Sequence, residues 1–267
     1  MRFSICKRFV VFALLMVLCS SYKAAAQDQV HRVLFVGNSY TYFHSMPELF
    51  AAIVEHQMPG HLVETKFLGG GGATMQKHWE VGFVVEALKN EKWDYVVLQG
   101  QSMLGSDDLT HPDSPKQFYK YAKMIDEAIE ANGAETVFFM TWSRKALKEQ
   151  QVYLTNAYTT VSNELDATLA PVGTVWHTLR DHPELELYEE DGSHPSISGS
   201  YVAAMTLAAT LFGILEEPAP GALYGQEILR GGALAEEKSQ LSNLPAETVE
   251  IIQNAVAETF LSSVEND

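Results

Sequence analysis

Short apolar runs alternate with longer stretches of helical spacing along most of the chain. The first run, residues 32–36, is nearly continuous in apolar side chains and ends at Gly37-Asn38. This pattern is typical of a strand that is buried on both faces of a parallel sheet. Similar runs occupy residues 62–68, 95–98, 136–140 and 172–176. The spacing predicts helices between them, over residues 46–57, 75–89, 117–132 and 149–169.

The regular alternation predicts successive βαβ units, with crossovers of about 20 to 30 residues, that build one parallel sheet. The expected fold class is α/β, a three-layer α/β/α sandwich with a central, mostly parallel sheet. After residue 176 we expect no further strand. Residues 196–213 form an apolar helix pattern, residues 216–225 a Pro/Gly-rich loop, and residues 246–264 a helical tail.

The first residues have the pattern of a secretory signal peptide. Basic residues precede an apolar run at 9–18, and the small residues 24–26 come before Gln27, as a signal peptidase site requires. The apolar run is about half the ~20 residues of a membrane span. We therefore expect cleavage near Ala26, a secreted or periplasmic protein, and one domain over residues 27–267. Lipid attachment at Cys19 is less favoured, because Leu18 occupies a position that usually holds a small residue.

Composition excludes several chemistries. Both cysteines, Cys6 and Cys19, lie in the expected signal peptide, so a mature chain has no disulfide, thiolate nucleophile or cysteine metal site. The sequence has 18 basic and 34 acidic residues, a net charge of −16, and removal of the four basic residues before Gln27 leaves 14 against 34, or −20. Such a surface repels polyphosphate, which disfavours binding to nucleic acid and to anionic lipid.

A serine lies directly after the first predicted strand. Residues 37–41 read Gly-Asn-Ser-Tyr-Thr and precede a predicted helix. Since the functional loops of parallel sheets follow the carboxyl ends of strands, Ser39 is a candidate nucleophile with a free backbone N–H. The alternative is a turn in which a serine or threonine caps the helix.

Two further loops offer hydrogen-bond donors. Residues 69–74, Gly-Gly-Gly-Gly-Ala-Thr, allow close approach of the backbone to a ligand, although they match neither a Walker loop nor a dinucleotide fingerprint. The alternative is a flexible connection. Residues 99–102, Gln-Gly-Gln-Ser, follow the strand at 95–98, and a neutral amide there could stabilise an oxyanion. Spacing leaves open which glutamine does so, or whether both only bond neighbouring loops.

A fourth loop pairs an acid with a histidine. Asp191 precedes His194 by three residues on a turn before a helix. A carboxylate there can bond to Nδ1 and leave Nε2 for the nucleophile; the alternative is a capped helix start. Other pairings are weaker: Asp181 and His182 are adjacent, and His111 with Asp113 lies in a polar loop. No His-Glu-x-x-His or comparable spacing occurs, so we expect neither zinc nor any other metal.

These four loops, in this order, resemble the blocks of the SGNH (GDSL-like) hydrolase superfamily, whose fold is flavodoxin-like. Residues 37–41 resemble its Gly-Asp-Ser-x-Ser/Thr block, with Asn38 where aspartate is usual. The resemblance implies that Ser39 is the nucleophile and that its N–H is an oxyanion donor. Asp191 and His194 match the Asp-x-x-His block, which implies that they complete a catalytic triad.

The resemblance also implies an oxyanion-hole glycine, for which Gly72 is the best match. The third block, usually Gly-x-Asn-Asp, is altered here to residues 99–102 without asparagine. Gln101 is the preferred replacement, ahead of Gln99 and Ser102. The expected pocket residues are Asn38, Tyr40, Gln99 and Trp142, where Trp142 is either a pocket wall or a lid over the core.

The function that follows is that of a secreted serine esterase without a cofactor, acting on small-molecule or carbohydrate esters and in particular on O-acetyl groups. Two alternatives stay open. One is a thioesterase or lipase that acts on longer acyl chains, and the other is a non-catalytic carbohydrate-binding relative, which the altered third block suggests. The sequence leaves the oligomeric state undetermined.

Overall fold

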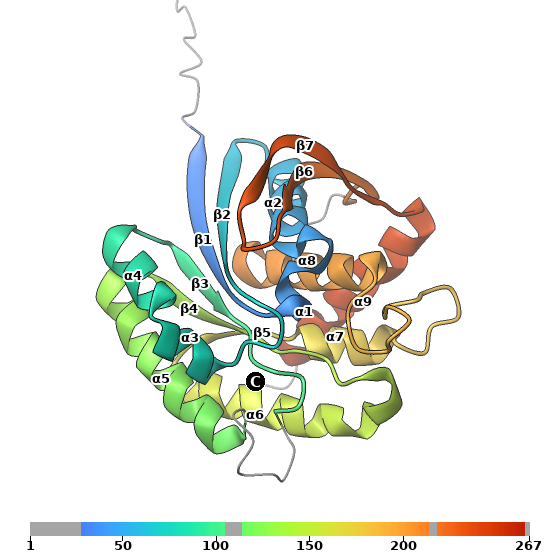
Figure 1. The fold of residues 1–267 in the computed structure, drawn as a ribbon. Helices are drawn as coiled ribbons and strands as arrows, with labels where there is room; N and C mark the ends of the chain where they lie inside the picture. The colour runs from blue at the N-terminus through green and yellow to red at the C-terminus, as the bar shows by residue number, and fades with distance from the viewer. Residues whose placement is uncertain (1–27, 105–113, 214–217, 265–267) are drawn as a thin grey trace, which may run out of the picture.

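The computed structural model describes residues 28–104, 114–213 and 218–264. Its centre is a five-stranded parallel sheet with the strand order β2-β1-β3-β4-β5 (Figure 1). The strands are β1 (Gln29–Gly37), β2 (His61–Gly69), β3 (Tyr95–Leu98), β4 (Glu135–Phe139) and β5 (Thr168–Ala170).

Helices cover both faces of this sheet, which confirms the three-layer α/β/α prediction (Figure 1). Side chains of β1 show why both faces are apolar: Val33 and Phe35 belong to one buried cluster, and Leu34 and Val36 to another. The first face is covered by α2 (Met46–Gln57), α7 (Val172–Leu179), α8 (Ile197–Phe212) and α9 (Ala246–Val264). The second is covered by α3 (Met75–Val81), α4 (Phe83–Asn90), α5 (Pro115–Asn132) and α6 (Gln151–Glu164).

Several elements lie where the apolar spacing predicts them. The helices α2 and α9 have the expected bounds, and α8 fills the apolar stretch before residue 213. The helix predicted over residues 75–89 is divided into α3 and α4 at Gly82, whose φ of 79° ends the first helix in the left-handed region. Glycine suits this position because it has no Cβ to clash there.

The prediction of a strand over residues 172–176 is wrong. These residues begin α7, and the fifth strand, β5, lies at the end of the stretch predicted as a helix over 149–169. The apolar residues Val172, Val175, Trp176 and Leu179 are all buried and follow the i, i+3, i+4, i+7 spacing of a helix. A short apolar run does not distinguish a strand from a helix, and β5 is only three residues long.

The expectation of no strand after residue 176 is also wrong. The strands β6 (Ala222–Ile228) and β7 (Leu234–Asn243) form an antiparallel hairpin beside α2 (Figure 1). Most of β7 is exposed and polar, and Leu241 and Ser242 are its buried residues. Such a strand lacks the clear alternation on which a prediction depends.

The expected signal peptide over residues 1–26, with Ala26 and Cys19, lies outside the described residues, as does the pair His111 and Asp113. Among the helices that are described, none is long and apolar enough to cross a membrane.

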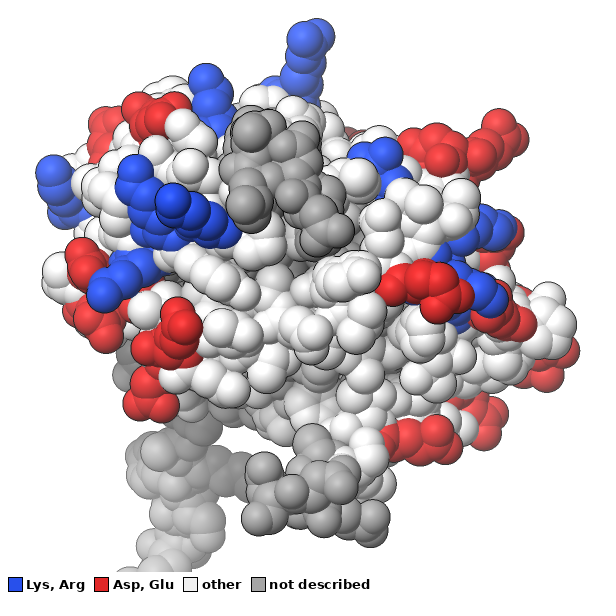
Figure 2. Space-filling model, turned by 90° about the horizontal axis from the view of Figure 1, so that it is seen from below, with Lys and Arg blue, Asp and Glu red and all other residues white. Residues whose placement is uncertain are grey.

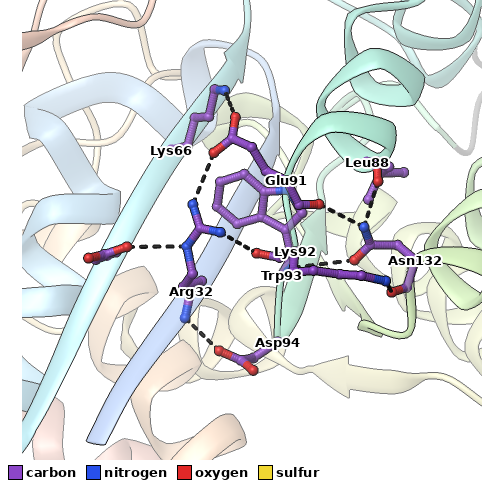
Figure 3. A network of polar contacts seen from close by, with 9 residues as sticks. Arg32, Lys66, Leu88, Glu91, Lys92, Trp93, Asp94 and Asn132 are labelled. Atoms are coloured by element: carbon purple, nitrogen blue, oxygen red, sulfur yellow. Dashed lines mark hydrogen bonds and ion pairs between the residues drawn. The ribbon is translucent and has the colours of Figure 1, made fainter. Parts of the chain in front are cut away.

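A polar network joins the amino-terminal end of the sheet to the helices around it (Figure 3). The backbone N–H of Arg32 donates to Asp94 at 2.7 Å, and its guanidinium donates to Lys92 O at 2.6 Å and to Glu91 at 3.0 Å. The same guanidinium lies 4.8 Å from the ring centre of Trp93. Arg32 thus links β1 to the turn that precedes β3.

Asn132 extends this network to the end of α5. Its Nδ2 donates to Leu88 O at 2.6 Å and to Glu91 O at 2.8 Å, and its Oδ1 accepts the backbone N–H of Trp93 at 3.3 Å. The side chain is buried. It therefore satisfies backbone groups that have no partner within α4 or β3.

We expect Asn132→Ala to lower the free energy of unfolding by about 2 to 3 kcal/mol, because it leaves these buried backbone groups without partners. Urea denaturation measures the change. The matched control is Asn90→Ala, which removes an exposed asparagine at the end of α4 and should change the free energy by less than about 0.5 kcal/mol. Equal effects of the two substitutions would contradict the stabilising role of the Asn132 hydrogen bonds.

Candidate active site

Four loops meet at the carboxyl-terminal end of the parallel strands. They follow β1, β2 and β3 or precede α8, and they are the same loops that the sequence singled out. Figure 2 views the molecule from below, toward this end, and the charged side chains lie mostly around the periphery of that face. The described residues at the centre of the face are thus largely uncharged.

Ser39 is the first residue of a short helix, α1 (Ser39–Tyr42). The N-cap is Asn38, whose Oδ1 accepts the backbone N–H of Tyr40 at 3.1 Å. This capping leaves the hydroxyl of Ser39 free for other contacts, although the residue as a whole is only 7% exposed. The alternative interpretation, in which Ser39 itself caps a helix, is therefore wrong.

Asn38 and Gln99 join the loops behind Ser39. Gln99 Oε1 accepts the backbone N–H of Asn38 and the hydroxyl of Thr41, both at 2.8 Å. Asn38 Nδ2 donates to Ala73 O at 3.1 Å and to Gly100 O at 3.4 Å. Asn38 is 3% exposed and Gln99 is fully buried, so the expectation that they line a pocket is wrong. They hold the backbone around Ser39.

The loop that carries Asp191 brings a histidine to Ser39. Asp191 Oδ1 accepts the backbone N–H groups of Ser193 at 2.8 Å and of His194 at 2.9 Å, while Oδ2 hydrogen-bonds to His194 Nδ1. His194 Nε2 lies 2.9 Å from Ser39 Oγ. The three predicted residues, which come from two distant segments, thus form one continuous chain of hydrogen bonds.

The same contacts set the charge of Asp191. Burial raises the pKa of this carboxyl, but the hydrogen bonds from the His194 ring and from the backbone N–H groups of His194 and Ser193 outweigh it and lower the pKa to about 2. Asp191 is therefore ionised at any pH at which the protein is expected to work. An ionised carboxylate accepts the Nδ1–H of the imidazole and favours the tautomer with Nε2 unprotonated.

Aromatic rings fix His194 from two sides. The ring of Phe43 stacks on the imidazole at 4.4 Å, and Tyr40 meets it edge-on at 5.8 Å. Sequence reasoning did not identify Phe43, which has no motif of its own beyond its place directly after α1. The backbone of Phe43 is also held in place, because its carbonyl oxygen accepts the hydroxyl of Ser200 at 3.2 Å.

Trp142 supports the loop that carries His194. It is fully buried, stacks between Tyr40 at 4.6 Å and Trp176 at 3.8 Å, and donates from Nε1 to Ser193 O at 3.1 Å. Tyr40, 5% exposed, adds a hydrogen bond between its hydroxyl and Ser193 Oγ at 2.7 Å. Trp142 has no exposed surface to offer as a pocket wall, so that expectation is wrong.

The candidate oxyanion donors differ in what else they bind. The amide oxygen of Gln99 accepts a hydrogen bond from the Ser39 loop, and its Nε2 donates to Gly100 O. The hydroxyl of Ser102 accepts a hydrogen bond from Arg144 Nε at 3.4 Å. Gln101 is half-buried, and its Nε2 donates to Gly72 O at 3.1 Å. Gln101 therefore meets Gly72 from the neighbouring loop, and it retains a second amide N–H.

The remaining candidates lie elsewhere. His182 accepts the backbone N–H of Glu184 at its Nδ1, at 3.3 Å, which uses that nitrogen within its own turn. Within the described part of the chain, no group of three or more His, Cys, Asp or Glu side chains could hold a metal ion.

His78 lies against the end of β1, the strand that leads to Ser39. This residue of α3 is 6% exposed and hydrogen-bonds to the backbone of Gly37. Burial disfavours the imidazolium more strongly than the bond to Gly37 favours it, and the pKa falls to about 4. The folded protein thus keeps a neutral imidazole next to the Ser39 loop in mildly acidic solution.

We expect this burial to make the protein less stable in acid. Between pH 6.5 and 4 the unfolded chain binds a proton at His78 that the folded chain excludes, so the free energy of unfolding should fall by about 3 kcal/mol over that interval. Urea denaturation at a series of pH values, with His78→Gln and with the exposed His56→Gln as control, measures this. The first variant should flatten the acid slope and the second should not. Identical slopes in all three proteins would refute the lowered pKa of His78.

Comparison with solved structures identifies the fold. A protein from Slackia heliotrinireducens assigned to the SGNH hydrolases is 27% identical, covers 68% of this chain and 100% of its own, and gives a TM-score of 0.56. TesA is 16% identical, with coverages of 68% and 98% and a TM-score of 0.53. Axe2, an acetylxylan esterase from Geobacillus stearothermophilus, is 12% identical, with coverages of 69% and 94% and a TM-score of 0.51.

Roughly a third of this chain lies outside each of these alignments. No protein-family model matches the sequence, and no curated protein matches it. In its fold, the chain is nevertheless similar to these SGNH-like hydrolases.

Proposed function

We propose that this protein is a serine esterase in which Ser39, His194 and Asp191 form the catalytic triad. The observation that carries the proposal is the hydrogen-bonded chain from Asp191 through both ring nitrogens of His194 to Ser39 Oγ, at 2.9 Å in its last step. A hydroxyl in this position loses its proton to the imidazole as it attacks a carbonyl carbon.

The reaction proceeds in two balanced steps. Ser39 Oγ bonds to the ester carbonyl carbon, His194 Nε2 takes the serine proton, and the alcohol leaves with that proton when the C–O bond breaks. A water molecule then gives a proton to His194, attacks the acyl-enzyme and releases the acid, and the proton returns to Ser39. Asp191 stays ionised throughout, because its pKa is about 2, and it stabilises the imidazolium.

The proposed oxyanion hole consists of the backbone N–H groups of Ser39 and Gly72 and the side-chain amide of Gln101. The hydrogen bond between Gln101 Nε2 and Gly72 O supports this assignment, because it links the two loops that would supply donors. Gln99, which is fully buried and already bonded to Asn38 and Thr41, is the poorer choice. Donors held before the reaction begins cost no reorganisation in the transition state.

The proposed substrate is an O-acetyl ester of a carbohydrate, cleaved outside the cytoplasm by a secreted or periplasmic protein that is processed near Ala26. Two observations support it. The basic, apolar and small-residue order of the first 26 residues favours export, and Axe2, which shares the fold, is an acetylxylan esterase.

A cavity beside the glycine loop favours a second candidate, the hydrolysis of longer acyl chains. Its volume is about 630 Å³, and its walls include Leu68, Val81 and Phe83. Phe83 is 63% exposed and Val81 is 40% exposed, so apolar surface is open to an acyl chain at this point. Burial of each additional CH₂ group there would contribute about 0.8 kcal/mol to binding.

Hydrolysis of p-nitrophenyl acetate, butyrate and octanoate tests both candidates. We expect the acetate ester to be cleaved, and expect Ser39→Ala and His194→Ala each to lower kcat by on the order of 10⁴-fold or more. A fluorophosphonate probe should label the wild type and not Ser39→Ala. Rates that rise with chain length would select the longer acyl substrates, whereas equal rates in wild type and variants would remove Ser39 from the mechanism.

The two glutamines of the third loop should separate catalysis from stability. Gln101→Ala is expected to lower kcat by on the order of 10²-fold with little change in the free energy of unfolding, because it removes one oxyanion donor from a half-buried site. Gln99→Ala should instead lower the free energy of unfolding by about 2 kcal/mol or more, since it leaves two buried donors unpaired. If Gln99→Ala instead lowered kcat without loss of stability, and Gln101→Ala lowered stability, Gln99 would be the oxyanion donor and Gln101 the structural residue.

A further inference from the structure

A second cavity lies on the other side of the glycine loop, between that loop and the tip of the β6–β7 hairpin. Its volume is about 680 Å³, which is far larger than an acetyl group and within the range of cavities that hold small-molecule ligands. Its walls are Tyr42, Phe67, Ile228, Leu229, Arg230 and the glycines 69–71, 231 and 232.

Two walls of this cavity lie close to Ser39 in the sheet or along the chain. Gly69, one of its walls, pairs in register with Gly37, which precedes Ser39 by two residues. Tyr42, another wall, is the last residue of the same four-residue helix that starts at Ser39, and a helix rises only about 1.5 Å per residue. A substrate with its ester at Ser39 can therefore extend into this cavity.

The hairpin tip is fixed in position. Leu229 N–H donates to Ala233 O at 2.7 Å and Gly232 N–H donates to Leu229 O at 3.0 Å, which closes the turn that carries Arg230. Gly232, at a φ of 87°, lies so close to β2 that a Cβ would be 2.8 Å from Phe67 O. The backbone N–H of Ile228 donates to Ser45 Oγ at 2.9 Å, which binds the hairpin to the turn after α1.

Arg230 differs from the other arginines that the structure describes. Arg32, Arg144 and Arg180 each donate side-chain hydrogen bonds within the protein. Arg230 is exposed, and it makes no side-chain hydrogen bond or ion pair with any described residue. The other walls of its cavity carry no charge. A planar guanidinium beside such walls matches a carboxylate, to which it can donate two parallel hydrogen bonds.

We propose that this cavity is a subsite for the carboxylate of an anionic ester substrate, such as an O-acetylated sugar acid, and that Arg230 binds the carboxylate. The proposal rests on the esterase function proposed above, because the ester of the same molecule would lie at Ser39. The surface of the protein is otherwise strongly acidic, with a net charge of −16, and repels anions in general. Selection of one charged group therefore requires a local cation such as Arg230.

The test compares two esters that differ only in the charged group, O-acetylated methyl glucuronoside and O-acetylated methyl glucoside. We expect wild type to show a kcat/KM about tenfold or more higher for the glucuronoside, as a charge-assisted hydrogen bond implies. In Arg230→Gln this preference should fall close to one, and in Arg230→Lys an intermediate preference should remain, since lysine keeps the charge without the planar fork.

Lys238→Gln is the matched control, because it removes one exposed positive charge from the same hairpin and does not line the cavity. It should keep the wild-type preference. A wild-type preference of one, or an undiminished preference in Arg230→Gln, overturns the proposal.

A binding measurement separates this proposal from the esterase function. Calorimetric titration of methyl glucuronoside and methyl glucoside into Ser39→Ala protein requires no turnover. Tighter binding of the glucuronoside that is lost on adding Arg230→Gln supports the subsite, even if p-nitrophenyl acetate were not hydrolysed by wild type. Equal binding of both sugars refutes the subsite, even if the esterase activity is present.

Discussion

The structure of the site depends on one buried acceptor, the amide oxygen of Gln99. This atom takes the backbone N–H of Asn38 and the hydroxyl of Thr41, and so fixes the backbone on both sides of Ser39. Asn38 in turn binds the carbonyl groups of Ala73 and Gly100. Three loops that follow three different strands are thereby joined, and the buried side chains of Asn38 and Gln99 have hydrogen-bond partners, as burial requires.

The histidine half of the site is built differently, from aromatic packing. Trp176, Trp142 and Tyr40 form a continuous stack that rises from the core to Ser193, and Phe43 covers the imidazole of His194. Large flat side chains with few rotatable bonds fix geometry at a small entropic cost. Ser39 is therefore positioned by hydrogen bonds and His194 by ring packing, and the two side chains meet in a contact of 2.9 Å.

Much of this arrangement was predictable, because its signals are local. The apolar run before Gly37 and the turn from Asp191 to His194 can be recognised in the sequence, and a parallel sheet brings the loops after its strands together. The errors have a common cause. Residues 172–176, the hairpin strands and the pocket role of Trp142 and Gln99 all depend on which neighbours cover a segment. That information comes from tertiary contacts and not from the local pattern.

The hairpin has a consequence for how such a protein could change its substrate. Its tip closes on itself through two backbone hydrogen bonds and meets the site region through Gly232 and the bond from Ile228 to Ser45. The residues that hold Ser39 and His194 in place come from other segments of the chain. With the proposed role of Arg230, reactivity and recognition are encoded in separate stretches of sequence. A library restricted to Leu229 and Arg230 would then vary recognition alone, so directed evolution could retarget the proposed enzyme without rebuilding its chemistry.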